Sequence, residues 1–252
     1  TGSKIAFADL QGASGTFNSG VNIDTGILQP LYDAGARVLS NSWGASNNGY
    51  NSLASDVDDF MHDNPDVLVL FAAGNTGQNG YHTAQAPSTN KNGVAVGASM
   101  NANNAWKYNF YPGVPEDYFD VESLANFSSR GPTSDGRLKP DVVGPGSKIT
   151  SALGTESTAN SGSGSVHCDI NQLQGTSMAT PGVAGVATLI REYFRDGYYP
   201  SGSPIAGNSF IPSGALLKAM LVQSAQTLTP PPQAILGVSM VSIMMVVMAE
   251  YN

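Results

Sequence analysis

The chain of 252 residues has few cysteines, histidines and charged side chains. Its single cysteine, Cys168, excludes an internal disulfide and leaves the redox compartment open. Charged residues make up 12% of the chain, and 11 basic residues against 19 acidic ones give a net charge of −8 without any basic cluster. This charge balance disfavours nucleic acid and anionic membranes as partners, so we expect neither.

The sequence also lacks an apolar run long enough to cross a membrane. The Met- and Val-rich run from Ala234 to Ala249 is shorter than the roughly 20 residues of a membrane span, and no basic residues flank it. A membrane anchor is therefore the weaker reading, and the artificial end of a gene model or of an expressed fragment is the preferred one. We assign residues 229–252, which contain Pro230-Pro231-Pro232, to an uncertain tail and residues 1–228 to one partial domain.

Hydrophobic residues make up 41% of the chain, which indicates a globular protein, and 29 glycines suit a fold with many loops. Short apolar runs alternate with segments of helical spacing, which predicts an α/β domain built on one sheet. The predicted strands are 5–8, 38–41, 66–73, 93–98, 142–143 and 149–153, and the predicted helices are 27–34, 53–61, 178–190 and 213–222. The first strand, predicted to be buried, begins so early that we expect the chain to start inside a domain.

One segment combines the features that a serine nucleophile needs. Gly175 allows a tight turn, and the small and apolar residues from Met178 to Ile190 predict a buried helix directly after it. Ser177 would lie at the helix N-terminus, where free N–H groups and the helix dipole stabilise negative charge, and Pro181 would occupy the first turn. From spacing alone, Ser177 also reads as an N-cap residue, because serine favours that position.

The string Gly-Thr-Ser-Met-Ala-Thr-Pro at residues 175–181 resembles the nucleophile segment of the subtilases, the subtilisin-like serine proteases of the peptidase S8 type. The resemblance covers residues 4–226. It implies a subtilisin-like three-layer α/β sandwich with a mainly parallel sheet, of which the N-terminal part is missing. It also implies hydrolysis of polypeptide substrates through an acyl-enzyme, with Ser177 as the nucleophile.

The segment Ala72-Ala73-Gly74-Asn75 follows the strongest predicted strand and is similar to the oxyanion-hole segment of the subtilases. The resemblance implies that the Asn75 amide faces the oxyanion from the side opposite the Ser177 N–H. It also implies that Ala73 and Gly74 line the specificity pocket. Without the resemblance, Asn75 reads as an ordinary turn residue after a strand.

A third segment, Ser42-Trp43-Gly44, resembles the family's edge segment, which pairs with substrate backbone and forms one wall of the specificity pocket. It follows a predicted strand, on the side where α/β sheets bind ligands. Taken alone, Trp43 reads as a core or interface aromatic.

The catalytic histidine and aspartate of the family have no counterpart in the sequence. Asp24-Thr25-Gly26 has the same residues as the aspartate motif of the family, but no His-Gly-Thr-His motif follows it. The segment Ser42-Trp43-Gly44 also follows Asp24 too closely for the family's usual spacing. We therefore read Asp24 as an N-cap or turn residue and expect both missing groups upstream of Thr1. The chain alone would then be feebly active at best. The alternative is a catalytically inactive, subtilase-like binding module that keeps the substrate cleft.

The remaining histidines form no recognisable site. His167 adjoins Cys168, but neighbours on an extended backbone point apart, which argues against a thiol nucleophile with its own base. His62 lies on a predicted helix surface and His82 in a loop. Three scattered histidines do not make a metal site.

Asp56, Asp58 and Asp59 fall within the predicted helix 53–61 and read as a solvated acidic face. No cofactor is expected for the chemistry, and the resemblance allows structural calcium ions without identifying their ligands. We expect a monomer, and the resemblance implies a secreted or extracellular protein.

Overall fold

The computed structural model describes residues 3–10, 22–101, 122–152, 170–228 and 241–242. A six-stranded sheet forms its centre, in the strand order β1-β2-β3-β4-β8-β7. The first five of these strands are parallel, and β7 (Gln226–Thr227) runs antiparallel to β8. Their bounds are Val38–Asn41 for β1, Leu68–Ala72 for β2, Val94–Ser99 for β3, Val142–Pro145 for β4 and Val241–Ser242 for β8. The mainly parallel sheet predicted from the sequence is confirmed.

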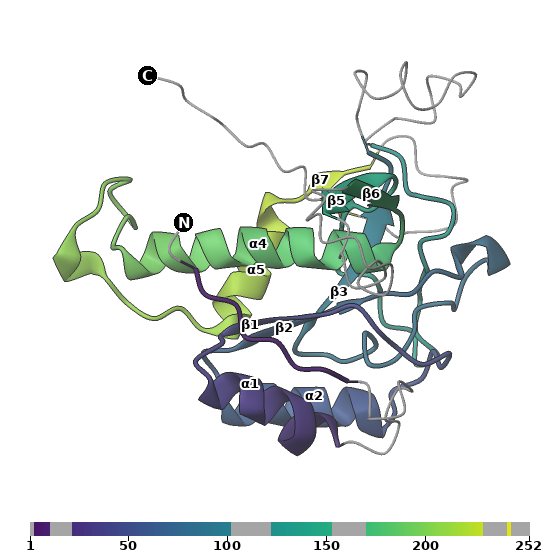
Figure 1. The fold of residues 1–252 in the computed structure, drawn as a ribbon, viewed down its shortest axis with the longest axis horizontal. Helices are drawn as coiled ribbons and strands as arrows, with labels where there is room; N and C mark the ends of the chain where they lie inside the picture. Colours follow the sequence, from purple (N-terminus) through teal and green to yellow (C-terminus); the bar gives the residue numbers. More distant parts are fainter. Residues whose placement is uncertain (1–2, 11–21, 102–121, 153–169, 229–240, 243–252) are drawn as a thin grey trace, which may run out of the picture.

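Helices cover both faces of the sheet, so the domain has three layers (Figure 1). α4 (Thr176–Arg195) packs across β1 to β4, and α5 (Gly214–Ser224) lies beside it on the same face. The opposite face carries η1 (Asp24–Leu28), α1 (Gln29–Asp33) and α2 (Ser52–Asp63). A separate antiparallel hairpin of β5 (Ile149–Ala152) and β6 (Ile170–Leu173) leads into α4, and the short helical turns are η2 (Gly77–Asn79) and η5 (Ala206–Asn208).

The strands β2 and β3 form the buried centre of the sheet, because every residue on both is shielded from solvent. Their parallel register pairs Leu70 with Val94 and Phe71 with Ala95. A strand that is covered by helices on both faces has no polar side, which explains the continuous apolar runs in the sequence. Each fully buried leucine or valine contributes roughly 1.5–3 kcal/mol relative to an exposed one, so these two strands anchor the fold.

The helix predicted at residues 178–190 is confirmed as part of α4. Its buried side carries small residues, among them Ala179, Val183 and Ala187, so the helix axis approaches the sheet closely. This packing fixes the N-terminus of α4 over the ends of β1 and β2.

The buried strand predicted at residues 5–8 is wrong. Residues 3–10 contain no regular element, and the side chains of Ile5 and Phe7 are 93% and 87% exposed. An extended segment gains no ladder hydrogen bonds without a partner strand, and none of the described strands pairs with these residues. Apolar composition alone therefore does not place a segment in a sheet.

Asp58 is buried rather than solvated, which corrects the prediction of an exposed acidic face. The residue is 7% exposed, and its carboxylate accepts the backbone N–H groups of Lys91 and Asn92 and the hydroxyl of Tyr50. These bonds satisfy a charge that would otherwise be costly to bury. Burial, together with the hydrogen bond to Asp58, raises the pKa of Tyr50.

The prediction that Asp24 is an N-cap or turn residue is wrong, because Asp24 is the first residue of η1. The capping oxygen comes from Asn22, whose side chain accepts the Thr25 N–H at 2.8 Å and the Thr25 hydroxyl at 3.0 Å. Asparagine and aspartate favour caps to a similar degree, so composition alone could not choose between these two neighbours.

Two residues of the predicted tail, Val241 and Ser242, form β8 between β4 and β7. The other residues of 229–252 lie outside the described part of the chain, as do Gln11–Gly20 and the His167-Cys168 pair. Within the described ranges, no helix has both the length and the apolarity needed to cross a membrane.

Candidate active site

Ser177 lies in the first turn of α4, as predicted. The helix begins at Thr176 after Gly175, whose φ of +154° belongs to the region that favours glycine. Ser177 is the second residue of the helix and not its N-cap. The prediction that Pro181 occupies the first turn is wrong, because it is the sixth residue of α4. Its missing N–H therefore affects the helix interior, where it would have bonded to the carbonyl of Ser177.

The backbone after β2 turns sharply at Gly74 and brings Asn75 beside the start of α4. Gly74 has a φ of +110°, and a Cβ there would lie 2.7 Å from the Gln85 side chain, so the position requires glycine. Ala73 is fully buried and continues the ladder by donating its N–H to the Val96 carbonyl at 2.9 Å. Gly74 donates its N–H to the Thr176 hydroxyl at 3.2 Å.

The Asn75 side chain is exposed, and its orientation is fixed by Thr176. Its amide oxygen accepts the Thr176 N–H at 2.8 Å and the Thr176 hydroxyl at 3.1 Å. The amide NH₂ group consequently points away from Thr176 with its donors available. Among the described residues, nothing accepts a hydrogen bond from the Ser177 N–H. The Ser177 N–H and the Asn75 NH₂ group are thus two donors near the start of α4, of the kind that can stabilise an oxyanion.

Ser42, directly after β1, contacts the nucleophile candidate twice. Its hydroxyl donates to the Ser177 carbonyl at 2.9 Å, and its carbonyl accepts the Ser177 hydroxyl at 3.2 Å. The next residue, Trp43, is half-buried and packs edge-on against the ring of Phe71, with the ring centroids 5.3 Å apart. A Cβ on Gly44 would lie 3.1 Å from the Ala86 carbonyl oxygen, so the backbone at Gly44 lies close to the backbone at Ala86.

A cleft of about 1300 Å³ runs along the outer side of β1. Residues 3–10 form its opposite wall, and it reaches Ser42 and Pro181 next to the start of α4. Within the described residues β1 pairs only with β2, so its outer backbone edge faces this cleft. The cleft offers room for another segment next to Ser42.

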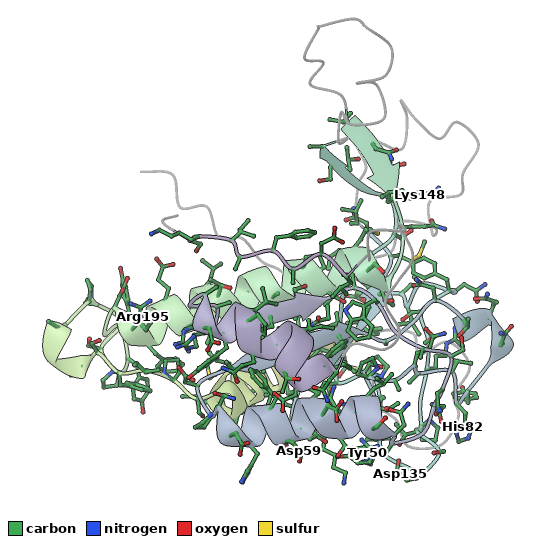
Figure 2. The ribbon with its side chains drawn as sticks, turned by 60° about the horizontal axis from the view of Figure 1, so that its bottom comes forward. Tyr50, Asp59, His82, Asp135, Lys148 and Arg195 are labelled. Carbon is green, nitrogen blue, oxygen red and sulfur yellow. The ribbon has the colours of Figure 1, made fainter. Side chains whose placement is uncertain are left out.

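The two described histidines are not assembled with Ser177. His62 is an exposed residue in the last turn of α2, on the face of the sheet opposite α4 (Figure 1). His82 lies in an exposed loop at the end of the molecule opposite Arg195 (Figure 2). In the part of the chain that the structure describes, no cluster of histidine, cysteine and acidic side chains could hold a metal ion.

The buried charges of the domain lie outside this site. Lys139 is 3% exposed, and its ammonium group lies 2.7 Å from the Asp141 carboxylate, which also accepts the Ala95 N–H at 2.7 Å. Burial lowers the pKa of Lys139, with the charge of Asp141 opposing that shift. Lys218 lies 3.5 Å from the same carboxylate. The group ties β3 to the start of β4 and has no contact with Ser177.

The structure therefore brings the segments that carry Ser177, Asn75, Ser42 and their neighbours together at the carboxyl ends of β1 and β2. Sequence reasoning missed the part played by Thr176, which holds the Asn75 amide by two bonds. It also missed the reciprocal contact between Ser42 and Ser177, for which residues 135 positions apart in the chain carry no local signal.

Several known proteins are similar to this chain. A model of the subtilase family matches residues 1–238. Serine protease/ABC transporter B family protein tagD of Dictyostelium discoideum is 34% identical over 90% of the chain, which spans 16% of that relative's length. Serine protease AprX of Bacillus subtilis is 36% identical over 49% of the chain and 26% of the relative.

Two solved structures share the fold. Patellamide maturation protease PatA aligns with a TM-score of 0.52 at 25% identity and covers 79% of this chain and 56% of that one. Sphericase aligns with a TM-score of 0.50 at 23% identity, and this similarity shows only that the fold is shared. The subtilisin-like α/β fold is confirmed. Because the family match runs from the first residue through the parallel sheet, the β5–β6 hairpin and α4 alike, the chain belongs to the subtilase family.

Proposed function

We propose that this chain supplies the nucleophile and the oxyanion hole of a serine endopeptidase that cleaves polypeptides through an acyl-enzyme. The observation that carries the proposal is the geometry at the start of α4. The Ser177 N–H has no partner among the described residues, and Thr176 binds the oxygen of the Asn75 amide, which leaves the NH₂ donors of that amide available. A bound carbonyl oxygen would receive both donors as it becomes negative.

Attack by Ser177 needs a base, because a serine hydroxyl is a weak nucleophile at neutral pH. We place the histidine base and its aspartate partner on sequence upstream of Thr1. The cleft between β1 and residues 3–10 supports this placement, since it reaches Ser42, whose carbonyl accepts the Ser177 hydroxyl. In a complete site the Ser177 proton would pass to that histidine and later to the leaving amine.

The substrate side would be formed by the two segments that follow β1 and β2. Ser42-Trp43-Gly44 lies next to Ser177 through the paired Ser42 contacts, and Ala73-Gly74 lies next to Thr176. Extended substrate would then run beside Gly44, with a side chain directed toward Ala73 and Gly74. We also propose a secreted monomer, whose structural calcium ions, where present, take no part in the chemistry.

Covalent labelling by a fluorophosphonate probe tests this function. The probe is applied to this chain and to a form extended upstream to contain the missing segment, each with its Ser177→Ala control. We expect labelling of the extended form, loss of labelling in its control, and little or no labelling of the 252-residue chain. Circular dichroism and urea unfolding of all four proteins establish that each is folded.

A folded extended form that takes up no probe would contradict the catalytic proposal. It would favour the alternative, an inactive subtilase-like module that binds polypeptides in the same cleft. Equal labelling of the 252-residue chain and the extended form would show that the base lies within the chain itself, and would overturn the placement of the histidine upstream.

A further inference from the structure

Pro181 removes one backbone hydrogen bond from the first turns of α4. In a regular helix the N–H of residue 181 would donate to the carbonyl of residue 177. Proline has no N–H, and its ring also crowds the carbonyl four residues earlier. The Ser177 carbonyl is therefore deprived of its helical donor at the residue that carries the nucleophile.

The Ser42 hydroxyl replaces this donor. It donates to the Ser177 carbonyl at 2.9 Å, a good distance for a hydrogen bond between a hydroxyl and a carbonyl. In return the Ser42 carbonyl accepts the Ser177 hydroxyl at 3.2 Å. The two serines thus form a closed pair of hydrogen bonds between the end of β1 and the first turn of α4.

Ser42 is well suited to hold Ser177, because both of its neighbours are anchored. Asn41 is 6% exposed, and its side chain donates to the Leu70 carbonyl of β2 at 3.3 Å. On the other side, Trp43 packs against the buried ring of Phe71. The Ser42 backbone therefore has little freedom. Its hydroxyl can thus hold the first turn of α4 in a fixed position relative to the sheet.

We propose that Ser42 is a positioning residue for Ser177: its side-chain hydroxyl substitutes for the N–H that Pro181 lacks and so fixes the backbone of the nucleophile. The catalytic part of this inference rests on the proposed function. Fixing the Ser177 carbonyl also fixes the plane of the neighbouring peptides, and with it the direction of the Ser177 N–H toward the oxyanion. The Ser42 side chain thus contacts Ser177, while other backbone groups of the segment Ser42-Trp43-Gly44 would contact the substrate.

A double-mutant cycle tests the hydrogen bond without any need for activity. Urea unfolding is measured for the wild-type chain, Ser42→Ala, Pro181→Ala and the double variant. We expect Ser42→Ala to lower the folding equilibrium constant about fivefold when Pro181 is present, the loss typical of one hydrogen bond. With alanine at 181 the helix supplies its own N–H, and the same change should lower the constant less than twofold. Equal losses in both backgrounds would overturn the inference.

Two matched variants complete the cycle. Ser40→Ala removes another exposed serine hydroxyl two residues earlier on β1 and should show no coupling to Pro181→Ala. Ser42→Thr keeps the hydroxyl and should restore most of the stability that Ser42→Ala loses. Failure of threonine to restore stability, or coupling of equal size at Ser40, would assign the effect to packing and contradict the hydrogen-bond role.

The functional readout is the rate of fluorophosphonate labelling in the extended form. Ser42→Ala should lower the limiting labelling rate about tenfold and leave the concentration of probe at half-saturation unchanged, because positioning of Ser177 affects reaction and not probe binding. Adding Pro181→Ala should recover part of that rate. A change confined to half-saturation would mean that Ser42 acts on substrate instead. If no form is labelled, the proposed function fails, while the unfolding cycle still decides the hydrogen bond.

Discussion

The Asn75 amide oxygen accepts two hydrogen bonds from Thr176, one from the backbone N–H at 2.8 Å and one from the hydroxyl at 3.1 Å. Because the oxygen is occupied, the orientation of the amide is fixed without any bound ligand. In the proposed reaction the donors of the NH₂ group would therefore need little reorganisation when negative charge develops on the substrate carbonyl oxygen.

Replacing Asn75 by aspartate should separate catalysis from stability. A carboxylate at this position still accepts both bonds from Thr176, so the free energy of unfolding should stay close to that of the wild type. The variant offers no donor to an oxyanion and adds negative charge beside it. We expect the limiting rate of acylation to fall by about 10²- to 10³-fold or more, the range seen for an oxyanion donor of subtilisin itself.

Asn75→Ala is the matched control for that variant. It removes the donor and also the acceptor of the Thr176 N–H, so it should lose both rate and stability. Rate is measured by burst kinetics on the extended form and stability by urea unfolding. A rate that is unchanged in Asn75→Asp would exclude the Asn75 amide from the oxyanion hole.

Thr176→Val should destabilise the fold by about 1–3 kcal/mol. The Thr176 residue is fully buried, and its hydroxyl both donates to Asn75 and accepts the N–H of Gly74, which would be left without a partner. Thr176→Ser keeps the hydroxyl and should cost less than half as much. The two variants are compared by urea unfolding, and a loss in Thr176→Ser as large as that in Thr176→Val would contradict the dominant role of the hydroxyl bonds.

Gly74→Ala and Gly182→Ala should have effects of opposite sign. At Gly74 the φ of +110° and the 2.7 Å approach of the Gln85 side chain make a Cβ costly, and we expect a loss of at least about 1 kcal/mol. At Gly182, within α4, a Cβ would meet nothing within 4 Å, and alanine should add about 0.5–1 kcal/mol through helix propensity. Differential scanning calorimetry would compare both with the wild type, and a stabilising Gly74→Ala would contradict the described turn.

Asp141→Asn should destabilise the fold by about 3 kcal/mol at neutral pH. The substitution leaves the Lys139 ammonium group, which is 3% exposed, without the carboxylate at 2.7 Å. Asp135→Asn, which breaks an exposed pair with Arg137, should change stability little. Urea unfolding at pH 7 measures both, and a loss at Asp135 as large as that at Asp141 would contradict the special role of burial.

The lowered pKa of Lys139 makes its contribution depend on pH. Between its folded pKa and the ordinary value of 10.5, the unfolded chain binds a proton that the folded chain does not. The contribution of Lys139 to the free energy of unfolding therefore rises with pH across that window. The difference in stability between the wild type and Lys139→Met should grow in favour of the wild type as pH increases toward 10.5. A difference that shrinks would mean that the pKa is raised.

The sequence by itself determined the fold class and the residues of the central strands. The runs that form β2 and β3 are apolar throughout because both faces of those strands are covered, and this pattern is readable without a structure. The position of Ser177 at the start of α4 was equally readable, because Gly175 and the small residues after Ser177 act locally. Local backbone preferences and the periodic pattern of buried residues can both be recognised in a run of consecutive residues.

Only the tertiary structure decided which distant groups meet. Asp58 lies on a helix face that appeared solvated, yet the loop at Lys91 buries it, and Ile5 and Phe7 form an apolar run that no described strand covers. The pairing of Ser42 with Ser177 joins two segments that are 135 residues apart in the chain. It also depends on Pro181, which lies inside α4 and has no N–H to donate to the Ser177 carbonyl. Such contacts are set by how elements pack in three dimensions, and consecutive residues contain no record of that packing.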